Sequence, residues 1–110
     1  MSSDLQYEQL TAVSDLIRRK KLSSGEVTDA TLQRIAKLDG QYHSYATVHA
    51  ERSLDQAKAA DAEISRDLWR GPLHGVPIAV KDLCYTTFAA TLAGSTIFKN
   101  FVGDRSKVPF

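Results

Sequence analysis

The stretch of residues 71–82 (GPLHGVPIAVKD) restricts the fold of this chain more than any other part of its sequence. It begins with two glycines and two prolines within seven residues, namely Gly71, Pro72, Gly75 and Pro77. A regular helix is not expected here, because proline fixes φ and lacks an N–H, while glycine adopts conformations that other residues avoid. The apolar residues 78–80 then favour a short buried strand. We therefore expect a rigid, irregular turn that leads into a strand, with Lys81 directly after it.

Lys81 is the residue of this stretch that bears on chemistry. A lysine at the end of a buried strand needs either a carboxylate partner or a depressed pKa, and a depressed pKa would make it a proton acceptor near neutral pH. The alternative is a side chain that reaches solvent or pairs with Asp82. The spacing of the residues leaves both interpretations open.

The first half of the chain is expected to be helical. Thr11 is a suitable N-cap, and Val13 and Ile17 would share one face of the helix that follows. The basic run 18–21 is expected to close this helix, because the helix dipole favours positive charge in a last turn. A nucleic-acid patch is the less favoured interpretation of the same four cations.

A second helix is expected to begin at a capping box. Ser23 and Glu26 have the required spacing, and the apolar pattern continues to about Leu38. Gly40 is expected to end the helix, because glycine is the preferred residue just after a helix C-terminus.

One strand and a third helix are expected before the turn. Residues 45–48 are β-prone and are expected to pair with residues 78–80. Residues 51–68 carry a narrow apolar stripe with many alanines, which indicates a helix that lies close to a neighbour. Asp61 falls inside this stripe, and a structural tie to a nearby loop is favoured over a catalytic role.

Composition excludes several classes of function. The 14 Lys plus Arg against 13 Asp plus Glu leave a net charge of +1, so no broad field for nucleic acid or an anionic membrane is expected. No apolar run approaches the ~20 residues of a membrane-spanning helix. Cys84 is the single cysteine and is expected to be a packed side chain; with no secretory signal at the N-terminus, this agrees with a cytoplasmic location.

The three histidines do not indicate a metal site. His74 is expected to bond to the backbone of its own turn, and His43 and His49 lack the spacing of metal ligands. No cofactor and no metal are expected.

Taken together, these segments resemble the amidase signature family, which includes amide hydrolases and the A subunit of the glutamyl-tRNA(Gln) amidotransferase. Residues 71–82 look like the family's strand leading to its catalytic lysine. Three weaker matches run in the same order: residues 23–27 resemble the start of the second helix, 45–48 the first strand, and 57–61 the helix before the glycine-rich turn. The resemblance covers residues from about 10 to 95.

The resemblance implies an α/β fold, the N-terminal portion of an amidase-signature α/β/α sandwich with a mixed sheet, with helices first and short strands after them. It also implies that Lys81 is the lysine of a Ser, cis-Ser, Lys triad. Buried and neutral, Lys81 would accept a proton through the bridging serine, so that the nucleophilic serine attacks an amide carbonyl while backbone N–H groups hold the oxyanion. In the family both serines lie in a later glycine- and serine-rich segment, which this sequence lacks; Ser95 matches an Ala-Gly-Ser turn instead.

As a domain, residues 1–110 are expected to be a partial amidase domain, with N-terminal helices in 11–68, the lysine strand and turn in 71–95, and a divergent tail in 96–110. Phe88 and Ala89 depart from the family pattern. The tail departs as well, because the family continues into a helix that Pro109 would interrupt.

Two classes of function stay open. The first is the N-terminal segment of a hydrolase that cleaves carboxamide C–N bonds, inactive alone because only Lys81 of the triad is present; the N-terminal part of the amidotransferase component is a rival within this class. The second is a non-catalytic product, a helical module that docks on a partner or complements a separate C-terminal piece. The expected partners are a small-molecule amide in the full-length enzyme and, for the chain alone, a complementing chain or further copies of itself, because Phe98, Phe101 and Phe110 would leave apolar faces exposed.

Overall fold

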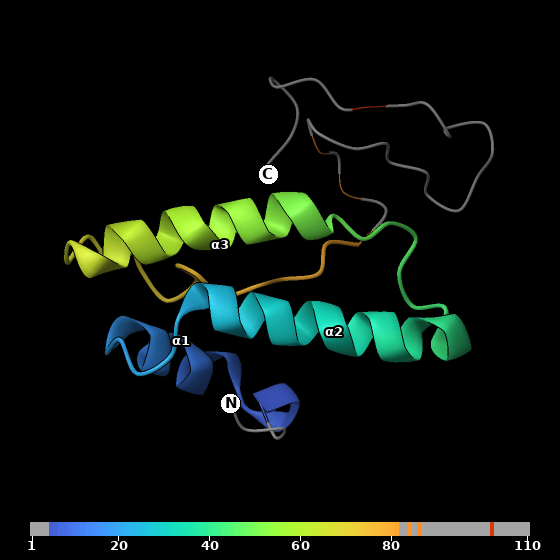
Figure 1. The fold of residues 1–110 in the computed structure, drawn as a ribbon, viewed down its shortest axis with the longest axis horizontal. Helices are drawn as coiled ribbons and strands as arrows, with labels where there is room; N and C mark the ends of the chain where they lie inside the picture. Colours follow the sequence, from blue (N-terminus) through green and yellow to red (C-terminus); the bar gives the residue numbers. More distant parts are fainter. Residues whose placement is uncertain (1–4, 82–83, 85, 87–101, 103–110) are drawn as a thin grey trace. The chain divides into compact units, whose positions relative to one another are not determined.

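A computed structural model of the chain describes residues 5–81, 84, 86 and 102. The chain divides into two units, Met1–Pro77 and Ile78–Phe110. All helices among the described residues lie in the first unit (Figure 1): a 3₁₀ helix η1 (Leu5–Tyr7), α1 (Leu10–Arg18), α2 (Ser24–Tyr42) and α3 (Ala50–Ser65). No described helix is long and apolar enough to cross a membrane.

The start of α1 differs from the sequence prediction. The helix begins at Leu10 with Gln9 as its N-cap, and no side chain caps it, so the expectation that Thr11 is the N-cap was wrong. The chain already turns at η1, where the N–H of Glu8 donates to the carbonyl of Leu5 at 3.1 Å. Leu5 of this turn packs against the core, and α1 starts two residues before the position that a threonine cap requires.

Helices α1 and α3 end in the same way. Lys20 and Asp67 both have a φ of 61° and each lies two residues beyond the last helical residue. The next N–H in each case, of Lys21 or of Leu68, donates back to a helix carbonyl at 3.0 Å. This is the Schellman arrangement, which satisfies the last carbonyls and usually places glycine at the left-handed position.

The start of α2 confirms the predicted capping box. The Ser23 side chain accepts from the N–H of Glu26 at 3.0 Å, and the N–H of Ser23 donates to the Glu26 carboxylate at 3.4 Å. Both bonds join residues three apart in the sequence, so the motif is set locally.

The end of α2 lies beyond the predicted one. Gly40 is inside the helix, which continues to Tyr42 and ends where His43 adopts a φ of 51°. Asp39 explains the extension, because its carboxylate accepts from the N–H groups of Ser44 at 2.7 Å and Tyr45 at 3.1 Å. These bonds satisfy the turn after the helix, so a glycine is not needed there.

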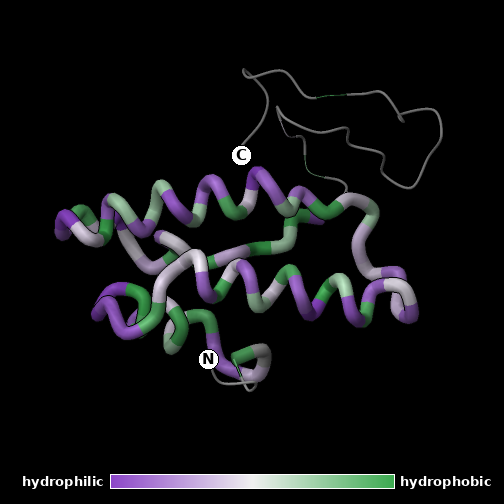
Figure 2. Tube along the Cα trace, in the orientation of Figure 1, coloured by the Kyte–Doolittle hydropathy of each residue, from purple (hydrophilic) through white to green (hydrophobic). Residues whose placement is uncertain are grey.

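Helices α2 and α3 lie side by side and run in opposite directions, with α1 near the start of α2 (Figure 1). Hydrophilic and hydrophobic residues alternate along both long helices (Figure 2). Ala57 and Ala60 are buried and small, which allows the helices to approach closely. The core consists of buried apolar residues of the three helices, with partly buried ones packed on it: Val13, Ile17, Val27 and Ile64, then Leu5, Leu22, Trp69 and Val76.

The third helix is shorter than predicted. It spans Ala50–Ser65 instead of residues 51–68, and Leu68, expected on its apolar stripe, is 54% exposed. The Schellman turn at Asp67 reverses the chain before Leu68 can join the stripe.

The two predicted strands are not formed in the described chain. Residues 45–48 and 78–80 are neither helix nor strand, so neither run forms its predicted strand among the described residues. A strand exists only where a neighbouring backbone accepts and donates its hydrogen bonds, and no described segment does so for either run. Ile78 and Val80 are correspondingly 58% and 40% exposed, not buried.

Candidate functional site

Lys81 lies at the end of the described part of the 71–82 segment. Its side chain is exposed, so the buried environment that was expected for it is not present in this structure. The reason is the one that leaves residues 78–80 exposed: a strand is buried only when other elements cover its faces. Asp82 and Ser95 lie outside the described residues. Cys84 is half-buried, in keeping with a packed side chain.

The turn before Lys81 is held against the helices at Gly75. Its φ of 81° is a left-handed conformation, and a Cβ built on it would lie 3.2 Å from Cβ of Ser24 and 3.3 Å from Cγ2 of Ile17. Only glycine meets both demands at once. The Ser24 hydroxyl donates to the Gly75 carbonyl at 2.6 Å, and Ser24 is 1% exposed. The turn is therefore attached to the first residue of α2.

Asp61 attaches α3 to the same place. Its carboxylate accepts from the N–H of Ser24 at 2.7 Å and from the N–H of Gly25 at 2.9 Å. A carboxylate at a helix N-terminus satisfies donors that lack an intrahelical partner and complements the helix dipole. The predicted structural role of Asp61 is confirmed, although its partner is the first turn of a helix.

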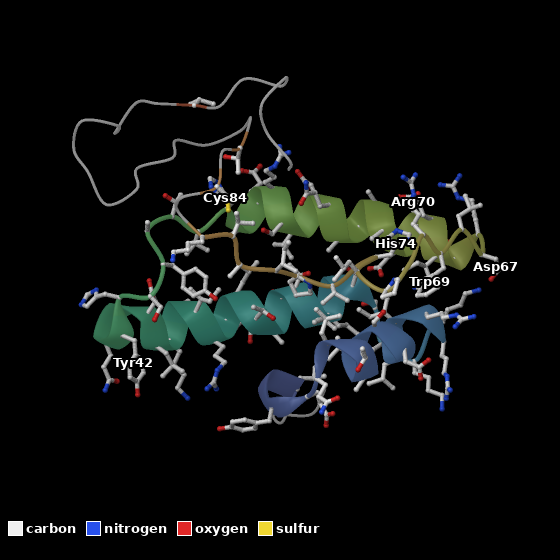
Figure 3. All side chains as sticks on the ribbon, turned by 180° about the vertical axis from the view of Figure 1, so that it is seen from behind. Tyr42, Asp67, Trp69, Arg70, His74 and Cys84 are labelled. Carbon is white, nitrogen blue, oxygen red and sulfur yellow. The ribbon has the colours of Figure 1, made fainter. Side chains whose placement is uncertain are left out.

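His74 bonds to its own turn, as predicted. Its Nδ1 accepts from the N–H of Arg70 at 2.9 Å, its Nε2 lies 3.7 Å from Oε1 of Glu63, and its side chain is 8% exposed. Arg70 in turn donates to Glu63 at 2.6 Å. Figure 3 shows Trp69, Arg70 and His74 close together beside the C-terminal end of α3. Within the described ranges, no three His, Cys, Asp or Glu side chains gather in a way that could hold a metal ion.

The basic run at the end of α1 is used within the molecule. Arg18 stacks over Trp69, with Cζ 4.7 Å from the ring centroid, and Arg19 pairs with Asp15 at 3.0 Å. Lys20 Nζ lies 2.9 Å from Oδ1 of Asp67. The hydrogen bond from Lys20 and then its charge lower the pKa of the Asp67 carboxyl below its ordinary value of 3.8. These partners favour the structural interpretation of the run over a nucleic-acid patch.

Sequence reasoning missed Ser24. The residue follows the capping serine and was counted only as part of that motif. The signal was the small Gly25 beside it, because Asp61 Oδ2 lies 3.3 Å from where a Cβ of Gly25 would be. A serine and a glycine in the first turn of a helix permit close approach of a second chain segment.

Comparison with known proteins places the chain in a family. The family model described as Amidase matches residues 26–108, which include the turn and Lys81. The chain belongs to the amidase family. Two curated relatives and one solved structure illustrate the range of its similarity.

The chain is 58% identical over 93 residues to "Putative amidase AmiD" of Mycobacterium tuberculosis, covering 84% of this chain and 20% of that protein. It is 39% identical over 99 residues to the A subunit of the glutamyl-tRNA(Gln) amidotransferase of Moorella thermoacetica, covering 90% of this chain and 20% of that protein. The chain thus spans about a fifth of the length of the curated relatives it matches.

A solved structure shares the fold of this chain, with a TM-score of 0.81 and 28% identity. The match covers 89% of this chain and 21% of that one, and the structure is described as a vestigial protein complex that reveals the evolutionary origins of an s-triazine catabolic enzyme. The helical arrangement seen here therefore occurs as one part of a longer, related chain.

Proposed function

We propose that this chain supplies Lys81 as the catalytic lysine of an enzyme that hydrolyses carboxamide C–N bonds by a Ser, cis-Ser, Lys mechanism. The observation that carries the proposal is the 71–82 segment, which resembles the family's lysine segment and is attached to the helices at Gly75. A base that acts on a bound substrate needs a fixed position, and a turn with a fixed origin helps to provide one.

In this mechanism Lys81 acts as the base. As a neutral amine it accepts a proton through the bridging serine, and the nucleophilic serine attacks the amide carbonyl. Both serines, the oxyanion donors and the remaining strands of an α/β/α sandwich would come from sequence beyond the part that aligns here. Coverage of Lys81 by those strands would also supply the burial that favours its neutral form.

Simple carboxamides are the substrate class that we propose. The higher identity to AmiD, 58% against 39% for the amidotransferase component, favours a hydrolase over part of a transferase. The exposed Ile78 and Val80 favour a second candidate, in which this chain complements a separate chain that covers them.

A chimera tests the proposal. The 93 aligned residues of AmiD would be replaced by those of this chain, and hydrolysis of aromatic and aliphatic carboxamides measured. Lys81→Ala and Lys81→Arg should each lower kcat/KM by about 1,000-fold or more, because alanine has no base and the guanidinium does not lose its proton at neutral pH. The 110-residue chain alone should give no turnover.

Lys37→Ala is the matched control, because Lys37 is an exposed lysine in α2. Its activity should equal that of the unmodified chimera. A chimera that hydrolyses amides equally well with alanine at position 81 would contradict the proposal. Turnover that appears only when the chain is mixed with the rest of AmiD as a second chain would favour the complementing role.

A further inference from the structure

The hydroxyl of Ser24, in the first turn of α2, forms its hydrogen bond outside its own helix. The N–H groups at the start of α2, from which a serine hydroxyl could accept, already have other partners. The Asp61 carboxylate accepts hydrogen bonds from the N–H groups of Ser24 and Gly25, and the Ser23 side chain accepts one from the N–H of Glu26. The Ser24 hydroxyl is thereby left to donate outward, across 51 residues of sequence, to the carbonyl of Gly75.

The contact at Gly75 is close as well as polar. The residue is surrounded by Ile17 on α1 and Ser24 on α2, and the turn on either side is closed by two backbone bonds. These bonds run from the N–H of His74 to the carbonyl of Gly71 at 3.0 Å and from the N–H of Val76 to that of Leu73 at 3.1 Å. Among the described residues, the hydrogen bond from the Ser24 hydroxyl to the Gly75 carbonyl is the one through which a side chain attaches this turn to α2.

We propose that Ser24 is a positioning residue, whose hydroxyl holds Gly75 and so fixes the origin of the segment that carries Lys81. This inference rests on the proposed catalytic role of Lys81. Lys81 lies six positions after Gly75, so its backbone stays within about 20 Å of the fixed carbonyl, and Pro77 removes one degree of backbone freedom on the way. If the backbone at Gly75 is free to move, Lys81 is more often out of its catalytic position. This slows the chemical step more than it weakens substrate binding.

The first test is hydrogen exchange on the full 110-residue chain. Ser24→Ala should speed exchange of the Val76 amide by about fivefold, the effect of losing one hydrogen bond on local opening, and leave the amides inside α3 unchanged. Equal exchange at Val76 in the two chains would overturn the inference.

The second test is kinetic and uses the AmiD chimera. Ser24→Ala should lower kcat by about tenfold or more while KM stays within about twofold, since a misplaced base affects the chemical step. Gly75→Ala should give the same pattern, because its Cβ would displace the turn while leaving the hydroxyl intact, and it serves if Ser24→Ala does not fold.

Thr31→Val is the matched control. The Thr31 hydroxyl donates to the Val27 carbonyl at 2.8 Å, so the variant loses a hydroxyl-to-carbonyl bond of the same kind, but one within α2. It should change neither Val76 exchange nor kcat. A Ser24→Ala chimera with unchanged kcat, alongside an inactive Lys81→Ala chimera, would overturn the role of Ser24 and keep that of Lys81. An active Lys81→Ala chimera would instead overturn the catalytic proposal, and hydrogen exchange would still test the Ser24 contact.

Discussion

Lys20 and Asp67 occupy left-handed positions at helix ends, where glycine is the preferred residue. Each has a φ of 61°, a conformation that costs a residue with a Cβ about 1 kcal/mol relative to glycine. Lys20 Nζ lies 2.9 Å from Oδ1 of Asp67, so an ion pair joins the C-terminal ends of α1 and α3. Both groups are exposed to solvent, so the ion pair is weak.

The Asp67 carboxylate should make stability depend on acid pH. Its pKa in the folded chain is lowered, first by the hydrogen bond from Lys20 and then by the charge of Lys20. A lowered folded pKa contributes stability above the ordinary value of 3.8, and this contribution is lost as the pH falls through the folded pKa. The midpoint of urea unfolding of Asp67→Asn should therefore lie below that of the parent at about pH 6 and converge with it at about pH 2.

Lys20→Gln is the companion variant, because it removes the other partner of the same pair. It should show the same convergence at low pH. A constant difference between Asp67→Asn and the parent across the whole range would mean that the pair does not act through ionisation.

Asp61 joins two elements. Removing its carboxylate leaves the N–H groups of Ser24 and Gly25 without an acceptor at the start of α2, where the helix dipole also favours a negative charge. Asp61→Ala should lower the free energy of unfolding by about 2 kcal/mol, measured by urea unfolding near neutral pH.

Asp55→Ala provides the comparison for Asp61, since Asp55 lies on the exposed side of the same helix. It should change the free energy of unfolding by less than about 0.5 kcal/mol. Equal effects of the two variants would show that the bonds from α3 to α2 do not stabilise the helix pair.

Considered whole, the chain presents apolar side chains that its own described residues do not cover. Leu68 is 54% exposed and Leu73 60% exposed, and both lie in the unit that holds the helices. The predicted exposure of Phe98, Phe101 and Phe110 concerns residues outside the described ranges. Exposed apolar side chains of this size favour association.

We expect the isolated chain to self-associate. Its sedimentation coefficient should rise with protein concentration, because association removes the exposed leucines from water. The double variant Leu68→Ser and Leu73→Ser should weaken the dependence, and Thr11→Ser, an exposed change on α1, should leave it as it is. A concentration-independent monomer would contradict this expectation and favour an independent module.

The features predicted correctly are those set by neighbours in the sequence. The capping box joins Ser23 to Glu26, three residues apart, and the turn at residues 71–77 follows from glycine and proline themselves. The family resemblance was carried by the same local segment and is confirmed by the family match. Catalysis by Lys81 remains a prediction.

Only the tertiary structure decided the partners that lie far apart in sequence. Asp61 finds Ser24 across 37 residues, and Ser24 finds Gly75 across 51, and no local pattern specifies either pairing. The two expected strands also depended on distant residues, because a β-prone run becomes a strand only when another backbone lies beside it. Local sequence determined where the second helix starts and the chain turns, whereas tertiary packing decided what holds those pieces together, because burial and hydrogen bonding join residues by proximity in space.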